Sequence, residues 1–239
     1  MPLGLGNFPS KRLVDIISRL QDKYYISVAT GRSLNDAIEI IDFLGLKDEC
    51  IISAGSEIYN PVSRKVVWQK RLSSSAVNRI KSALRGSTAK ANLGTMLDAD
   101  KTAGEISVNV NEETTVIYVT AMQEDDATKL EKELEHQHLH VISTDSFWEK
   151  GLKDLHIMAK DASKEHALAE LLKIFQISKE ESVVAGDGQN DIGLFNAGGL
   201  KIAMGNAVPE LKELADTVIG DADSDGLAEY LETLILGDK

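Results

Sequence analysis

The spacing of hydrophobic and polar positions changes along the chain in a regular way. Residues 11–21 place apolar side chains three or four positions apart, which predicts an amphipathic helix. The short apolar run at 24–29 (YYISVA) predicts a buried strand, and residues 50–53 predict another. Between them a helix is expected, with Ser33 as its N-cap and Asp36 at position N3 in a capping box. Strand, helix and strand with short connections favour a parallel sheet covered by helices.

The middle of the chain has a different pattern. Alternating apolar and polar positions there indicate strands with one exposed face, separated by amphipathic helices. Helices are expected at 71–86 and 125–136, and strands at 104–111, 113–121, 139–144 and 152–159. This mixture predicts a small α+β unit of roughly 80 residues, within the usual size of a domain.

The last third returns to strands alternating with helices. Strands are expected at 182–185, 201–203 and 217–219, and helices at 164–175, 191–197, 209–215 and 226–236. The predicted fold class is therefore α/β, with a parallel sheet core interrupted by an inserted α+β cap. The core is assigned to residues 1–71 and 156–239, and the cap, expected to set substrate specificity, to residues 72–155.

Polar residues follow the predicted core strands at the ends where open α/β sheets bind ligands. Thr30, Gly31 and Arg32 can offer a hydroxyl and backbone amides to an anion, and Lys164 opens a helix and can place a point charge beside a phosphate. Asp187 and Asp191 suit Mg²⁺, and Asn190 can orient the carboxylates or the phosphate. Taken singly, these residues could equally be a helix cap, a solvated lysine and a tight turn.

Their order along the chain resembles a known family. GDGQND, followed by LFNAGGLKIAMGNAVPELKELADTVI, looks like the fourth motif and tail of haloacid dehalogenase superfamily phosphatases of the Cof type, subfamily IIB. VATGR is similar to their second motif and Lys164 to their third. The resemblance implies Mg²⁺-dependent hydrolysis of a phosphomonoester through an aspartyl phosphate. In that scheme Thr30 and Lys164 bind the phosphoryl group with Gly31, Arg32 and Asn190, and the metal residues are Asp187 and Asp191.

The first motif of that family, an apolar strand ending in Asp-x-Asp-x-Thr, does not precede Thr30 at its usual distance. The attacking aspartate is therefore expected to be missing, with negligible phosphatase activity and unpaired strand edges as consequences. An N-terminal segment or a neighbouring chain could fill the gap, so a homo-oligomer is possible. Residues 98–102 (DADKT) spell the motif within the predicted cap, after a poor strand, and residues 4–8 (GLGNF) are a second, less well spaced alternative.

The substrate is expected to be a small sugar phosphate. VATGRSLNDAIEII and ISAGSEIY look most like sucrose-phosphate phosphatases, whose cap carries a strand of the form KISYH. This chain has EISVN at 105–109, so both sugar-contacting positions differ and another sugar phosphate or a glycosyl-glycerate phosphate fits as well. The alternative function is a non-catalytic sugar-phosphate-binding or regulatory module, such as the tail of a glycosyltransferase.

The composition of the chain limits the classes of partner that it can be expected to bind. The formal net charge of −12 disfavours nucleic acid and anionic membranes, which bind through Lys and Arg. No apolar run reaches the ~18 residues of a membrane helix, no secretory signal is evident, and the single Cys50 excludes an intrachain disulfide. These features indicate a cytoplasmic protein, and the acidic charge also disfavours anionic small molecules unless a local site attracts them. The small phosphorylated ligand is what the family resemblance implies.

Two further patterns are weaker. Asp221, Asp223, Asp225 and Glu232 match a calcium loop, although a strand rather than a helix is predicted before them. The alternating histidines at 136, 138 and 140 could share a strand face as metal ligands, but a solvated corner between helix and strand fits their polar surroundings better.

Overall fold

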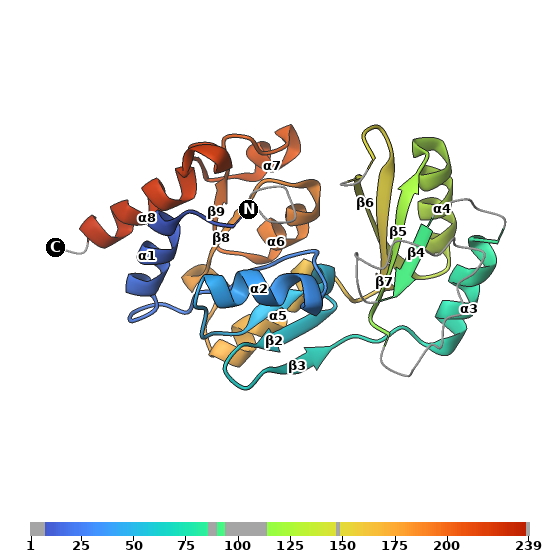
Figure 1. Cartoon of the computed structure of the whole chain (residues 1–239), viewed down its shortest axis with the longest axis horizontal. Coiled ribbons are helices and arrows are strands. Elements are labelled where there is room, and N and C mark those ends of the chain that lie inside the picture. The colour runs from blue at the N-terminus through green and yellow to red at the C-terminus, as the bar shows by residue number, and fades with distance from the viewer. Residues whose placement is uncertain (1–7, 86–89, 94–113, 147–148, 238–239) are drawn as a thin grey trace.

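The computed structural model describes residues 8–85, 90–93, 114–146 and 149–237, and these form two lobes side by side (Figure 1). One, called the core lobe below, contains both ends of the described chain. The other, called the cap lobe, is built from the middle of the sequence. Two connections join them, one entering the cap lobe and one leaving it. The predicted division into 1–71 with 156–239 and 72–155 remains a prediction, and strand β7 (Lys153–Ala159) runs across its second boundary.

The cap lobe is an antiparallel sheet with two helices on one face. Its strand order is β4-β5-β7-β6, from β4 (Lys90–Leu93), β5 (Val116–Met122), β6 (Leu139–Asp145) and β7. Helices α3 (Ser74–Ala83) and α4 (Glu124–His136) follow the predicted periodicity. Helix α4 buries Ala127, Leu130 and Leu134, which share one face and pack on the sheet. The predicted α+β character of this segment is confirmed over its described residues.

The C-terminal half of the core lobe is a parallel sheet of order β10-β9-β8. Its strands are β8 (Val183–Gly186), β9 (Leu200–Ala203) and β10 (Thr217–Val218). Four helices accompany them: α5 (Lys164–Phe175), α6 (Ile192–Ala197), α7 (Pro209–Leu214) and α8 (Gly226–Gly237). The fully buried Phe195 lies in the cluster that joins α5 and α6 to these strands. The predicted strand–helix alternation is confirmed here.

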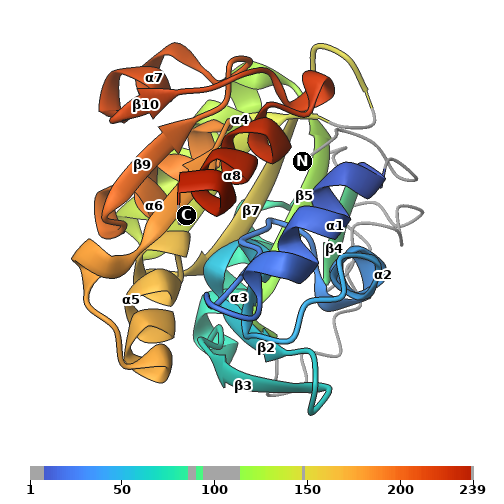
Figure 2. The same cartoon turned by 90° about the vertical axis from the view of Figure 1, so that its left-hand side faces the viewer.

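The N-terminal half is a three-stranded antiparallel sheet. Strand β1 (Cys50–Ile52) pairs with β2 (Glu57–Asn60), which pairs with β3 (Lys65–Gln69). Helix α2 (Leu34–Phe43) packs on β1, and α1 (Lys11–Leu20) lies beside α8 through Ile16, Leu20 and Ala228 (Figure 2). Short 3₁₀ turns at Ser53–Gly55 (η1), Lys179–Glu181 (η3), Gln189–Asp191 (η4) and Ala222–Ser224 (η5) complete the elements.

Two local predictions are wrong. Residues 24–29 form an extended segment rather than a strand, because they join β1 through one parallel bridge, Ala29 to Ile51, and no strand of the described residues lies on their other side. Tyr25 stacks on Phe175 instead. At α2, the Ser33 hydroxyl donates to the Asp36 carboxylate at 2.6 Å and makes no side-chain bond to the helix amides, so the expected capping box does not form.

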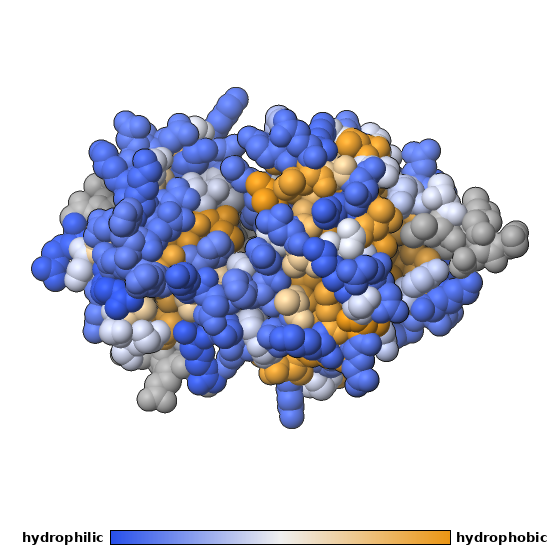
Figure 3. All heavy atoms as spheres, turned by 180° about the vertical axis from the view of Figure 1, so that it is seen from behind, coloured by the Kyte–Doolittle hydropathy of each residue, from blue (hydrophilic) through white to orange (hydrophobic). Residues whose placement is uncertain are grey.

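Among the described residues the core lobe therefore contains two separate sheets, β1-β2-β3 and β10-β9-β8, instead of one continuous sheet. Strand β8 pairs with β9 on one side, and within the described residues nothing pairs with its other edge. Val183, the first residue of β8, is half exposed. Seen from behind, apolar atoms gather over the core lobe and the cap lobe is mostly hydrophilic (Figure 3). No helix among the residues described is long and apolar enough to cross a membrane.

Candidate functional site

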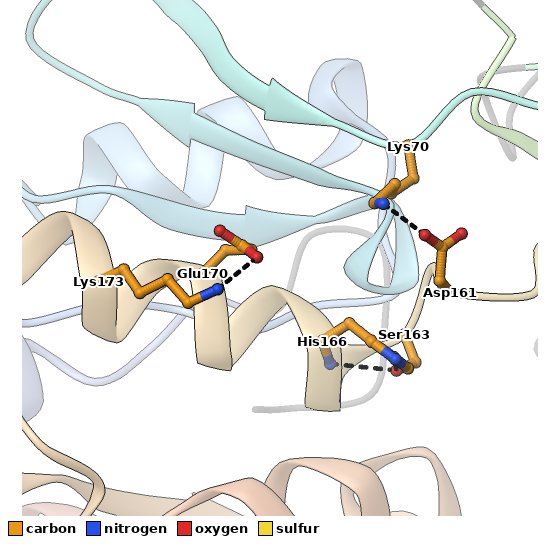
Figure 4. Close-up of polar contacts among 6 residues, drawn as sticks. All are labelled: Lys70, Asp161, Ser163, His166, Glu170 and Lys173. Atoms are coloured by element: carbon orange, nitrogen blue, oxygen red, sulfur yellow. Dashed lines mark hydrogen bonds and ion pairs between the residues drawn. The ribbon is translucent and has the colours of Figure 1, made fainter.

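Lys164 is held at the first position of α5. Ser163 precedes it as the N-cap, and its hydroxyl accepts a hydrogen bond from the His166 amide at 3.2 Å; the same hydroxyl contacts the His166 ring (Figure 4). The Lys164 side chain is buried, and its Nζ lies 2.5 Å from Oδ1 of Asp191. A buried ammonium requires such a partner, so the two side chains form one unit.

Asp191 also closes the loop before it. Its Oδ2 accepts the amides of Asp187 and Gly188, each at 3.1 Å. Gly186 permits this closure, because a Cβ there would lie 2.7 Å from the Asp191 Cβ. Burial acts to raise the pKa of Asp191, but the Lys164 charge and the three hydrogen bonds outweigh it and hold the pKa below its usual value. Asp191 is therefore ionised at neutral pH.

Asp187 is partly exposed and is oriented by a residue that the sequence analysis missed. Nδ2 of Asn206 donates to Oδ2 of Asp187 at 3.1 Å, and Oδ1 of Asn206 accepts the Ala222 amide at 2.9 Å. Asn206 lies in the segment MGNA that carried part of the family resemblance, and this was the available signal. The Asp187 carboxylate thus keeps a fixed direction while part of it stays accessible.

The loop of Thr30, Gly31 and Arg32 is tied to η1. The Thr30 carbonyl accepts the Ala54 amide at 3.1 Å and the Arg32 carbonyl accepts the Ser53 amide at 2.7 Å. The Arg32 amide donates back to Oγ1 of Thr30 at 3.2 Å. Thr30 is buried, so this loop is a rigid part of the site.

Two close approaches bring this loop to the other site residues. A Cβ on Gly31 would lie 3.9 Å from Nδ2 of Asn190, the residue before Asp191. At the other end of η1, a Cβ on Gly55 would lie 2.3 Å from the Lys164 backbone nitrogen. Gly31 therefore lies near Asn190, and Lys164 lies beside both η1 and Asp191, although these residues come from separate parts of the chain.

The cap lobe adds Tyr118 and His156, which the sequence analysis did not single out. They face each other across β5 and β7, with ring centroids 4.8 Å apart and an interplanar angle of 77°. The Tyr118 hydroxyl donates to the Gly31 carbonyl at 3.1 Å. Burial lowers the pKa of His156 to about 4, with the Lys164 charge acting in the same direction, and burial raises the pKa of Tyr118. At neutral pH His156 is uncharged and Tyr118 is a hydrogen-bond donor.

Polar contacts also join the two connections between the lobes. Lys70, directly after β3, forms an ion pair with Asp161, which follows β7 (Figure 4). Nearby, the Glu57 carboxylate accepts the Ser53 hydroxyl at 2.8 Å and the Thr115 hydroxyl at 3.0 Å. Glu57 thereby links η1 of the core lobe to the segment that enters β5. These contacts hold the cap lobe against the loop of Thr30.

The weaker metal patterns gain no support from the geometry. In the described ranges no three His, Cys, Asp or Glu side chains are grouped to hold a metal ion. Glu232 of the calcium-loop pattern pairs with Arg12 at 2.6 Å, and the His136 ring contacts the Lys132 carbonyl. Residues 4–7 of GLGNF, DADKT at 98–102 and EISVN at 105–109 lie outside the described residues.

The chain belongs to a known family. The model of the haloacid dehalogenase-like hydrolases matches residues 6–102 and 90–231, which together cover most of the sequence, so the chain is a member of this hydrolase family. Solved structures agree in fold. A haloacid dehalogenase-like hydrolase from B. subtilis superposes with a TM-score of 0.79 at 21% identity, covering 96% of this chain and 95% of that one. The subclass IIB sugar phosphatase BT4131 gives 0.76 at 17% identity, covering 97% and 94%.

Curated relatives carry phosphatase names. A phosphoglycolate phosphatase of Archaeoglobus fulgidus is 43% identical over 79 residues, which is 33% of this chain and 35% of the relative. The 5-amino-6-(5-phospho-D-ribitylamino)uracil phosphatase YcsE of Bacillus subtilis is 25% identical over 235 residues, 92% of this chain and 86% of the relative. The chain spans little more than a third of the length of the first curated relatives it matches.

Proposed function

We propose that the chain binds the phosphoryl group of a small phosphomonoester between the Thr30–Arg32 loop and the Lys164–Asp191 pair. The observation that carries the proposal is that these groups lie together beside the loop that follows β8. A hydroxyl, backbone amides and a buried ammonium are the donors that a phosphate dianion requires. The strongly acidic chain otherwise repels anions, so such a local concentration of donors argues for an anionic ligand.

Mg²⁺ is the proposed cofactor, and the residues present fit it in part. Mg²⁺ is usually held by one or two carboxylates, with substrate phosphate and water completing the shell. Asp187 offers a fixed, partly accessible carboxylate, whereas Asp191 already accepts three hydrogen bonds. Asp187 would therefore hold the ion directly and Asp191 would support it through the shared loop. When bound, the ion would supply positive charge to the phosphoryl oxygens.

Because the chain belongs to this hydrolase family, the proposed reaction is the hydrolysis of a sugar phosphate to the free sugar and phosphate. The phosphoglycolate and ribityl phosphatases among the relatives, and the sugar phosphatase among the structures, support a small phosphorylated substrate. In this reaction Lys164 would neutralise phosphoryl charge, and the Thr30 hydroxyl would orient the group. Neither residue is proposed as the nucleophile, and the Lys164 ammonium is engaged by the Asp191 carboxylate.

For residues 1–239 taken by themselves, negligible turnover is proposed, because no Asp-x-Asp-x-Thr lies among residues 1–29. The second candidate function is a non-catalytic sugar-phosphate-binding module, which would need only the proposed ligand-binding residues Thr30, Lys164 and Asp191. Among the described residues β8 has one edge without a partner strand, and a strand from a second copy could pair there, so the proposed homo-oligomer would use this edge.

Calorimetric titration with orthophosphate, with and without MgCl₂, tests binding. We expect Lys164→Met to abolish it and Lys173→Met, an exposed lysine on the same helix, to leave it unchanged. If both variants bind equally, the proposed site is wrong. Hydrolysis of p-nitrophenyl phosphate tests turnover separately. Mg²⁺-dependent hydrolysis that Asp187→Ala abolishes would show an active phosphatase and overturn the non-catalytic candidate.

A further inference from the structure

One hydrogen bond passes directly from the cap lobe to the proposed phosphate loop. The hydroxyl of Tyr118, on β5, donates to the carbonyl of Gly31 at 3.1 Å across 87 residues of sequence. Tyr118 is fully buried, and Val116, Met158 and Ala54 pack in the same cluster. Buried at this junction, the hydroxyl has the Gly31 carbonyl and the Ser53 side chain as its polar neighbours.

The direction of the Gly31 carbonyl determines the direction of the next amide. In a planar trans peptide the C=O and the following N–H point in opposite directions, so fixing one fixes the other. The Arg32 amide accordingly points away from Tyr118 and donates to Oγ1 of Thr30 at 3.2 Å. A threonine hydroxyl has one donor and two acceptor positions. Because the amide occupies an acceptor position, the O–H of Thr30 is left to donate to a ligand.

His156 supports this arrangement from the same side. Its ring meets Tyr118 edge-on, and a Cβ on Gly31 would lie 3.1 Å from its Cε1. A side chain at position 31 would require the His156 ring to shift by a few tenths of an ångström, so glycine suits this close approach. The buried Nδ1 of His156 finds no hydrogen-bond partner among the described residues, so this nitrogen contributes to the arrangement through packing alone.

We propose that Tyr118 is a positioning residue of the phosphate site, which through the Gly31 carbonyl and the Arg32 amide sets the Thr30 hydroxyl as a donor. The proposal rests on the proposed function. It couples the two lobes, because phosphate is bound at full strength only while the cap lobe lies against the core lobe. A bound phosphate in turn favours contact between the cap lobe and the core lobe, since such coupling is reciprocal.

Tyr118→Phe removes the hydroxyl and keeps the ring, and Tyr25→Phe is its matched control on an exposed tyrosine that stacks on Phe175. In the ligand-free protein, hydrogen exchange of the Arg32 amide, taken relative to that of Ile202 in β9, should become about threefold to tenfold faster in Tyr118→Phe only. The dissociation constant for orthophosphate should rise by a similar factor.

A double-mutant cycle separates positioning from packing. If Tyr118 acts through Thr30, then Tyr118→Phe changes the dissociation constant little once Thr30 is replaced by valine. Additive effects of the two substitutions, or an unchanged relative exchange rate at Arg32, would overturn the inference. If the unaltered protein does not bind orthophosphate, the proposed function fails, and the exchange measurement still decides whether Tyr118 orients the loop.

Discussion

The ammonium of Lys164 lies 2.5 Å from a carboxylate oxygen of Asp191, 27 residues further along the chain, and both side chains are buried. This pair joins the start of α5 to the loop after β8. Two charges taken out of water are stabilised only by each other and by their remaining hydrogen bonds. The pair is thus both a structural element of the core lobe and the centre of the proposed site.

Removing one member of this pair should be costly. Lys164→Met leaves the Asp191 charge buried without its partner, and we expect the free energy of unfolding to fall by about 3–5 kcal/mol, measured by urea denaturation. Lys164→Met/Asp191→Asn should recover part of this loss, because no isolated charge remains. Lys173→Met, which breaks an exposed pair with Glu170, should cost less than about 1 kcal/mol. Equal costs for the two single variants would contradict this account.

Stability should fall in weakly acidic solution because of His156. Its pKa is about 4 in the folded protein and 6.5 in the unfolded chain, so between these values only the unfolded chain binds the proton. The uncharged His156 therefore contributes fully to the free energy of unfolding above pH 6.5. This contribution declines as the pH falls toward about 4, by about 3 kcal/mol in all. His156→Phe should flatten this part of the stability curve, whereas His136→Gln should not. If the free energy of unfolding of His156→Phe depended on pH as that of the unaltered protein does, other groups would be the cause of the pH dependence.

Gly55 should tolerate no side chain. It has φ of 99°, and a Cβ would lie 2.2 Å from the backbone carbon of Ser163, beside Lys164. We expect Gly55→Ala to lower the free energy of unfolding by about 3 kcal/mol or more and to disturb the site. Gly45 also has positive φ, at 64°, but open space around it, so Gly45→Ala should cost only about 1 kcal/mol. Urea denaturation of both variants measures the difference, and similar values would mean that η1 moves freely away from α5.

Cys50 should be inert in the folded protein. It is completely buried in β1, and burial raises the pKa of its thiol to about 12, so almost no thiolate exists at neutral pH. We expect no reaction with a disulfide reagent such as Ellman's reagent until guanidinium unfolds the chain, after which one thiol should react. Rapid labelling without denaturant would show that the N-terminal half of the core lobe opens.

The sequence alone determined the local elements and the family. The periodicity of 164–175 predicted α5 with its observed bounds, because the helix is set by neighbouring residues and by the Ser163 cap. The same kind of signal located α1, α3, α4 and the strands of the parallel sheet. The motif residues were recognisable because Lys164, Asp187 and Asp191 occur in a characteristic order.

Only the tertiary structure decided which of these elements meet. Residues 24–29 have the composition of a strand, yet a strand requires partners on the sheet, and one bridge to β1 is all that they find among the described residues. The roles of Asn206, Tyr118 and His156 depend on contacts across many residues of sequence, such as the 87 between Gly31 and Tyr118. Periodicity reports which face of an element is buried but not against what, so these partners became visible only when the chain was folded.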